Sequence, residues 1–208
     1  MANTNRPNGF IPVGTLSGSP WQAHLRQYDL DASHSAIATG DLVKMTADGY
    51  LDLYTAGSTQ FIGVVVGILN HAADTVLGKQ GDHFLSNDRP TLSGVNSKSI
   101  PANTVGTVLV CVAPDVLLEA QEDGLVDPLE LADVGQNVEI IGGGPDATTG
   151  VSNMMIDSTS HAITNTLPLR LVGLVQRPDN EYITGGQAYT RWLVTPANHS
   201  LSGLNVGV

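Results

Sequence analysis

The chain has 208 residues, of which 41% are hydrophobic and 14% charged, and nine Lys and Arg against 20 Asp and Glu give a formal net charge of −11. A charge of that sign repels nucleic acid and anionic lipid, so we expect neither as a partner. The single cysteine, Cys111, excludes an internal disulfide, a paired-thiol redox site and a cysteine-based zinc site. The longest apolar run, residues 61–69, is too short to span a bilayer, and the polar start predicts no signal peptide.

Short β-rich runs separated by turn residues recur along the chain, at the spacing typical of an all-β barrel or sandwich. Charged residues, which populate helix surfaces, are about half as common as usual, and this scarcity also favours strands. We predict strands over residues 22–30, 42–45, 50–54, 61–69, 104–112, 138–141, 154–156, 169–175 and 189–194.

Three of these regions carry more specific predictions. Asp48-Gly49 predicts a two-residue hairpin turn between residues 42–45 and 50–54. Residues 61–69 are apolar on both faces, which is typical of a strand covered on two sides, and they are the best candidate for the core. Residues 116–125, in which leucines mix with acidic residues, offer a weak helical alternative, which Gly124 would end.

The two ends of the chain differ from its middle. Residues 1–20 hold three prolines, three glycines and one charged residue, so they predict either a disordered tail or an extended N-terminal arm that lies on a partner. Residues 198–208 predict a short C-terminal tail. Between them, residues 21–197 form a β-rich body with two faintly similar halves, about 21–113 and 114–197, for which an internal repeat and chance similarity are both open.

The residue pattern predicts no catalytic, metal or cofactor site. The six histidines lack the spacing of a zinc site, and the glycine run at 142–144 lacks the Lys and Ser or Thr of a phosphate-binding loop. Asp29, Asp31 and His34 lack the glycine and distal glutamate of a calcium loop, so we interpret them as a solvated strand end. The acids between residues 119 and 133 are interpreted as a solvated acidic face, since no aromatic platform for a sugar adjoins them. We therefore expect a protein without enzymatic activity.

The most distinctive motifs lie toward the two ends of the chain, and residues 70–101 and 115–133 carry none of them. The motifs are Asn5-Arg6-Pro7-Asn8-Gly9-Phe10, Pro12-Val13-Gly14, Leu16-Ser17-Gly18-Ser19-Pro20, Gly40-Asp41-Leu42-Val43, Ile62-Gly63-Val64-Val65-Val66-Gly67, Leu169-Arg170-Leu171-Val172-Gly173-Leu174-Val175, Arg177-Pro178-Asp179-Asn180-Glu181 and Trp192-Leu193-Val194. Together they resemble the capsid cement (decoration) proteins of tailed bacteriophages.

That resemblance implies a non-enzymatic, β-rich protein of the virion. Such a protein is made in the bacterial host cytoplasm, binds the outer surface of the head and stabilises contacts between major capsid protein subunits. It implies a homo-oligomer, in which we favour a trimer over a dimer. The net charge of −11 agrees with a place outside the DNA-filled interior. A phage tail or receptor-binding structural protein is the alternative, and a carbohydrate-active enzyme is a more distant one.

Under this hypothesis the N-terminal arm carries the contacts with the capsid, through Arg6, Pro7 and Phe10. We further predict that Trp21 and Trp192 anchor the contact, because aromatic residues dominate the energetics of protein–protein interfaces.

Overall fold

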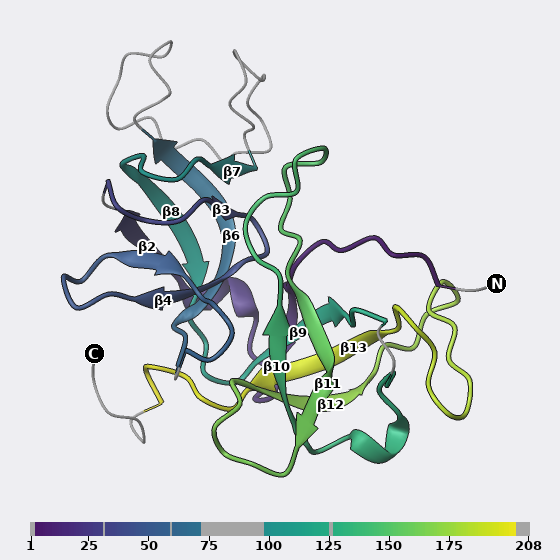
Figure 1. Ribbon diagram of the computed structural model, residues 1–208. Coiled ribbons are helices and arrows are strands. Elements are labelled where there is room, and N and C mark those ends of the chain that lie inside the picture. The colour runs from purple at the N-terminus through teal and green to yellow at the C-terminus, as the bar shows by residue number, and fades with distance from the viewer. Residues whose placement is uncertain (1–2, 31, 59, 72–97, 125–126, 203–208) are drawn as a thin grey trace.

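The computed structural model describes residues 3–30, 32–58, 60–71, 98–124 and 127–202 (Figure 1). This part of the chain is 42% strand and 4% helix, which confirms the all-β prediction. Two short 3-10 helices are present in it, η1 (Trp21–His24) and η3 (Leu131–Asp133). The strands are β1 (Ile11–Thr15), β2 (Leu25–Leu30), β3 (Ile37–Ala38), β4 (Leu42–Met45), β5 (Leu51–Leu53), β6 (Gly63–His71), β7 (Ser99–Ile100), β8 (Gly106–Cys111), β9 (Val116–Gln121), β10 (Asn137–Ile141), β11 (Met155–Ala162), β12 (Leu169–Leu174) and β13 (Arg191–Pro196).

Within the described residues the strands form two large antiparallel sheets, and β3 pairs with β7 in a short third one. The six-stranded sheet has the order β1-β9-β13-β12-β10-β11, and the five-stranded sheet has the order β2-β8-β6-β4-β5. The five-stranded sheet takes all its strands from residues 25–111, and the six-stranded sheet takes all but β1 from residues 116–196. The chain thus changes sheet between β8 and β9.

The six-stranded sheet curls so that its last strand, β11, meets its second strand, β9. Glu122, just after β9, forms an isolated parallel bridge with Ile156 of β11. The amide of Asp123 donates a hydrogen bond of 3.0 Å to the Ile156 carbonyl at the same point. Strands β9, β13, β12, β10 and β11 therefore form a ring of neighbours, as in a small barrel.

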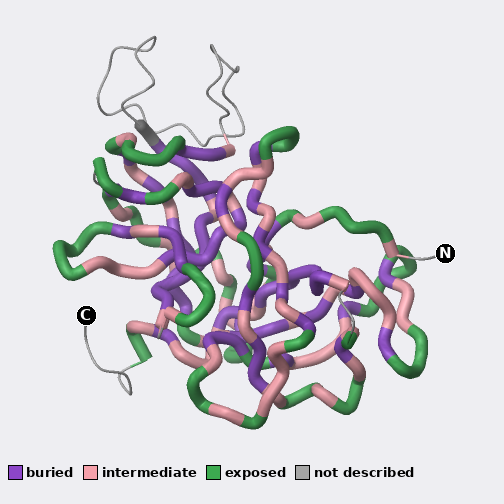
Figure 2. The backbone as a smooth tube through the Cα atoms, in the orientation of Figure 1, coloured by how far each residue is buried: buried purple, intermediate pink, exposed green. Residues whose placement is uncertain are grey.

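Side chains from both sheets meet in one continuous hydrophobic core, and Figure 2 shows the buried segments gathered in the interior. The largest fully buried side chains include Trp192, Tyr54, Phe10 and Phe61. The core strand expected at residues 61–69 is confirmed. It corresponds to β6, which begins at Gly63 and whose side chains Val64 and Val65 are buried.

Two expectations about local structure are wrong. Residues 116–121 form β9 rather than a helix, because β1 and β13 pair with it from either side and supply backbone partners that local propensity does not reveal. Residues 22–24 belong to η1, so the strand expected from residue 22 begins only at Leu25.

The N-terminal segment is part of the body rather than a free arm. Phe10 lies in the core, and β1 pairs with β9 from Ile11 opposite Glu119 to Thr15 opposite Val116. The segment has too few apolar residues to fold alone, but an adjoining strand provides both a core and hydrogen-bond partners. At the other end, His199 is buried and bridges in parallel to Phe61, whereas residues 203–208 of the expected tail lie outside the described residues.

A close crossing of two backbones joins the N-terminal segment to the five-stranded half. The Phe10 amide donates a hydrogen bond of 2.8 Å to the Gly40 carbonyl. Gly9 has a φ of +65°, and a Cβ atom there would lie 2.4 Å from the Gly40 oxygen. Only glycine satisfies both the left-handed backbone and the close approach.

Asp41, next to Gly40, forms hydrogen bonds that connect this crossing to the six-stranded half. Its buried carboxylate accepts hydrogen bonds from the Ser152 hydroxyl at 2.5 Å, the Ala38 amide at 2.7 Å and the Gly144 amide at 3.1 Å. Burial raises the pKa of Asp41 to about 6, and these hydrogen bonds oppose the rise. Segments that are distant in sequence are thus held together around one carboxylate.

The crossing generates a stability prediction. We expect Gly9→Ala to lower the free energy of unfolding by about 3 kcal/mol, since it adds a steric clash to the cost of a positive φ. Gly18→Ala is the matched control, because Gly18 has a φ of +79° but no atom within 4 Å of the added Cβ. The control should lose only about 1 kcal/mol. Equal losses in urea unfolding would show that the crossing is not tight.

Candidate partner-binding surface

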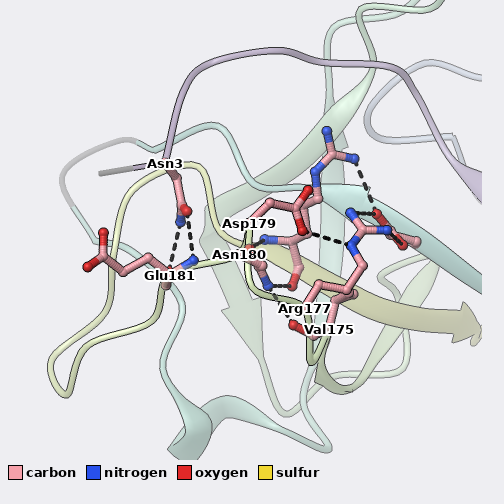
Figure 3. Close-up of polar contacts among 8 residues, drawn as sticks. Asn3, Val175, Arg177, Asp179, Asn180 and Glu181 are labelled. Atoms are coloured by element: carbon pink, nitrogen blue, oxygen red, sulfur yellow. Dashed lines mark hydrogen bonds and ion pairs between the residues drawn. The ribbon is translucent and has the colours of Figure 1, made fainter. Parts of the chain in front are cut away.

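The first described residues lie against the connection between β12 and β13, residues 175–190, as Figures 1 and 3 show. The Asn3 side-chain amide donates to the Glu181 carbonyl at 2.8 Å and to the Thr190 hydroxyl at 3.2 Å. Its oxygen accepts a hydrogen bond of 2.9 Å from the Glu181 amide. One asparagine side chain thus pairs with the connection much as a neighbouring strand would.

A second contact fixes the next residues of the N-terminal segment. The side chain of Gln121, at the end of β9, accepts a hydrogen bond of 3.1 Å from the Arg6 amide and donates one of 3.0 Å to the Asn5 side chain. The Arg6 side chain itself is exposed. The backbone is therefore held while the guanidinium stays accessible.

The β12–β13 connection is itself shaped by a buried asparagine. The Asn180 side chain donates to the Val175 carbonyl at 2.8 Å and to the Arg191 carbonyl at 2.9 Å, and it accepts from the Arg191 amide at 2.8 Å (Figure 3). These bonds replace strand pairing where β12 and β13 diverge. The Asn180 side chain thus joins the two ends of the connection on which the N-terminal segment lies.

A charged cluster anchors this connection to β9. The buried Glu119 carboxylate forms a bidentate ion pair with Arg177, with N–O distances of 2.8 and 2.9 Å. It also forms an ion pair with Arg191, at an N–O distance of 3.2 Å. Arg177 also contacts Asp179 at 3.1 Å. Burying a carboxylate is costly unless it is paired and hydrogen-bonded, and two guanidinium groups meet that need here.

The five residues that were expected to contact a partner differ in how far they are buried. Phe10 is 1% exposed and Trp192 is 0% exposed, so both are core residues and neither can touch a partner in the folded chain. Trp192 faces inward on β13 and meets Tyr182 edge-on, with ring centroids 6.0 Å apart. Arg6 is exposed, and Pro7 and Trp21 are half-buried, so these three remain accessible.

Sequence reasoning missed the side chains that hold this surface together, namely Asn3, Gln121, Asn180 and Glu119. Asn180 lies in a motif that the resemblance had singled out, but its role depends on the separation of β12 from β13. Glu119, Glu122 and Asp123 were interpreted as part of a solvated acidic face and are instead buried. An acidic residue in a strand gave no local signal of that burial.

Glu122 and Asp123 lie where β11 closes onto β9. Glu122 accepts a hydrogen bond of 2.8 Å from the Leu129 amide, and Asp123 accepts one of 2.8 Å from the Ser158 hydroxyl. Burial raises the pKa of Glu122 to about 7, with the hydrogen bond from Leu129 opposing the rise and the charge of Asp123 adding to it. A buried titratable group thus lies where the ring closes.

Chemistry-bearing groups are sparse elsewhere in the described residues. Ser19 Oγ lies 3.1 Å from His24 Nε2, a distance that suits a nucleophile and its base, but the Thr15 hydroxyl lies equally close to Ser19. In this part of the chain no carboxylate forms an ion pair with His24, and no group of three His, Cys, Asp or Glu side chains is placed to hold a metal. Nor does any helix there have the length and apolar character of a membrane span.

No protein-family model matches this chain, and no curated protein or solved structure is significantly similar to it. What the surface does is therefore inferred from its own residues.

The buried carboxyl group of Glu122 generates a pH prediction. Because its folded-state pKa of about 7 exceeds the ordinary 4.5, the stability it contributes is complete below pH 4.5 and is lost as the pH rises through 7. Glu122→Gln should remove this loss. We expect the unfolding free energy of wild type, relative to that of the variant, to fall by up to about 3 kcal/mol between pH 5 and pH 8. Parallel pH profiles in urea unfolding would contradict the assignment, and Glu181→Gln, at a half-exposed position, controls for the lost charge.

The two tryptophans should differ in stability measurements. Trp192→Ala removes the largest fully buried side chain, and we expect it to cost about 3–5 kcal/mol of unfolding free energy. Trp21→Ala truncates a half-buried ring that packs on the margin of the core, and it should cost clearly less. Equal losses in chemical denaturation would mean that Trp21 supports the core as much as Trp192 does.

Proposed function

We propose that the protein is a bacteriophage capsid cement protein, which binds the outer surface of the head without catalysis and stabilises contacts between major capsid protein subunits. The observation that carries this proposal is that the two ends of the chain, near which the motifs that resemble cement proteins lie, meet in space. Asn3, just before the first motif, and Glu181, at the end of a late one, are 178 residues apart and share two hydrogen bonds (Figure 3).

Two strands that carry such motifs, β1 and β13, flank the same strand, β9. Glu119 of β9 lies opposite Ile11 of β1 on one side and opposite Leu193 of β13 on the other. Arg177, in another of the motifs, binds the side chain of the same Glu119. Segments that carry motifs from both ends of the chain thus contact one strand, and this agrees with a common surface.

The rigidity of this surface supports a role in binding. A surface that is already ordered loses less conformational entropy when a partner docks, so more of the contact energy appears as affinity. The hydrogen bonds of Asn3, Gln121 and Asn180 provide such order without any ligand. Self-association into a trimer, which we favour over a dimer, and a position on the outside of the virion are parts of the same proposal.

The fold changes how the proposal should be tested. Deletion of residues 1–20 would remove Phe10 from the core and β1 from the six-stranded sheet, so loss of binding would not distinguish contact from misfolding. The full chain should instead be mixed with phage heads assembled without it, sedimented and imaged by electron microscopy. Regular density on the outer lattice is the expected result. Absence of binding to heads would overturn the proposal, and density on tails would favour a tail or receptor-binding protein.

Charge reversal on the N-terminal segment gives a matched comparison. Arg6→Glu should weaken binding to heads at least about tenfold if the accessible guanidinium faces the capsid. Arg26→Glu makes the same charge change at another exposed position, on β2 of the five-stranded sheet, and should bind like wild type. Equal binding by both variants would remove Arg6 from the contact.

A further inference from the structure

Strand β2 is the least protected edge strand of the two large sheets that the structure describes. Natural proteins protect exposed sheet edges with prolines, lysines, bulges or very short strands. At the other edges, β1 carries Pro12 and a shift in register, β5 has three residues, and the register of β11 with β10 is broken. By contrast, β2 has six residues without proline, glycine or lysine, and its register with β8 is continuous. The edge of β2 is therefore suited to pairing with a further strand.

The outer edge of β2 presents backbone groups that the described part of the chain does not pair. The Val112 amide donates a hydrogen bond of 3.0 Å to the His24 carbonyl, in register with the β2–β8 ladder. Because hydrogen-bonded pairs alternate along antiparallel strands, the backbone groups that point away from β8 are those of Leu25, Gln27 and Asp29. Among the described residues, no hydrogen bond reaches the amide or the carbonyl of Gln27 or Asp29.

The two halves of the molecule arrange their strands in the same way. Taken in chain order, the strands of the five-stranded sheet and the strands β9 to β13 both lie in the order first, fifth, fourth, second, third. Matching contacts recur as well. The Gly40 amide donates to the Val65 carbonyl at 2.8 Å, and the Gly135 amide donates to the Leu171 carbonyl at 2.9 Å. The register with the next strand shifts directly after Val65 and directly after Leu171. Strand β2 thus corresponds to β9.

Strand β9 is paired on both sides, whereas β2 is paired on one. Both β13 and β1 pair antiparallel with β9, and β8 alone pairs with β2 in the part of the chain that the structure describes. Strand β5 approaches β2 much as β11 approaches β9, but no ladder joins β5 to β2. The position that β1 fills in one half is therefore open in the other. Where it is filled, the added strand is antiparallel.

The β2 strand of a second copy fits this open edge. Two copies related by a two-fold axis perpendicular to the sheet pair antiparallel, as β1 and β9 do. A register centred on Gln27 sets Leu25 opposite Asp29 of the second copy and Arg26 opposite Tyr28, and it pairs all the outward backbone groups. No like charges face each other in it, whereas registers centred on Arg26 or Asp29 set that charge against itself. The Arg26 side chain, which donates to the Leu25 carbonyl at 3.1 Å, is exposed and free to turn aside.

We propose that β2 is a self-association surface, through which two copies of this chain pair edge to edge about a two-fold axis at Gln27 and join their five-stranded sheets. This inference does not rest on the proposed function, because it concerns the free chain. A trimer formed through another surface would be joined in this way to a second trimer. One strand pair buries less surface than a stable dimer needs, so we expect pairing to be reversible and to increase with protein concentration.

Backbone substitution at Gln27 tests the pairing. Gln27→Pro removes the outward amide in each copy, and we expect it to weaken pairing at least about tenfold. Gln27→Ala keeps the amide and should pair like wild type. Sedimentation equilibrium over a range of protein concentrations measures the dissociation constants. Physiological ionic strength is suitable, because it screens the distant charges of two copies that each carry −11 but leaves facing charges in contact.

Charge substitution at the same exposed position distinguishes a second β2 from any other strand. Gln27→Lys and Gln27→Glu each place like charges against each other across the two-fold axis, so we expect both to weaken pairing at least about threefold. Gln176→Lys and Gln176→Glu, at an exposed position in the β12–β13 connection, control for the change in net charge and should pair like wild type.

The outcomes decide the proposal without reference to phage heads. A wild type with one mass at all concentrations would overturn it, and so would a folded Gln27→Pro that associates as strongly as wild type. Opposite effects of Gln27→Lys and Gln27→Glu would show that β2 pairs with a different segment rather than with itself. Circular dichroism shows whether Gln27→Pro is folded. If it is not, the two charge variants, which leave the backbone unchanged, decide the question.

Discussion

The burial of the Glu119 carboxylate is the constraint on which much of the six-stranded half depends. A carboxylate in this position destabilises the fold unless cations reach it, and Arg177 and Arg191 do so from the two ends of the β12–β13 connection. The connection must therefore lie over β9. There it offers the backbone of Glu181 to Asn3, and in this way a buried charge on one strand determines where the N-terminal segment can lie.

Strand β9 takes part both in the hydrophobic core and in the buried polar contacts. Apolar side chains of β9, such as Leu118 and Ala120, contribute to the shared core, while its polar side chains organise the surface and the closure of the ring. Beyond the strand's end, the Asp123 side chain accepts hydrogen bonds from the amide and the hydroxyl of Ser158 on β11, and the Glu122 side chain accepts one from the Leu129 amide. One strand thus contributes both apolar side chains to the core and buried polar side chains that are paired with distant segments.

The proposed function gives the protein a role that depends on an ordered surface rather than on chemistry. The N-terminal segment offers an exposed cation, Arg6, on a backbone that Gln121 already holds. Under that proposal, a segment that is ordered before binding loses less conformational entropy when it docks.

Periodicity and composition alone determined the all-β class and the central strand that follows Phe61, because these depend on local patterns of apolar and turn residues. They could not determine that β1 pairs with the distant β9, because the local pattern of a short segment with prolines and glycines does not indicate which strand will pair with it. Nor could they tell the buried Trp192 from the accessible Trp21, or the buried Glu119 from a solvated acid. Burial is a property of what packs around a residue, and only the tertiary structure brings Arg177, Arg191 and Asn3 to their places from distant parts of the chain.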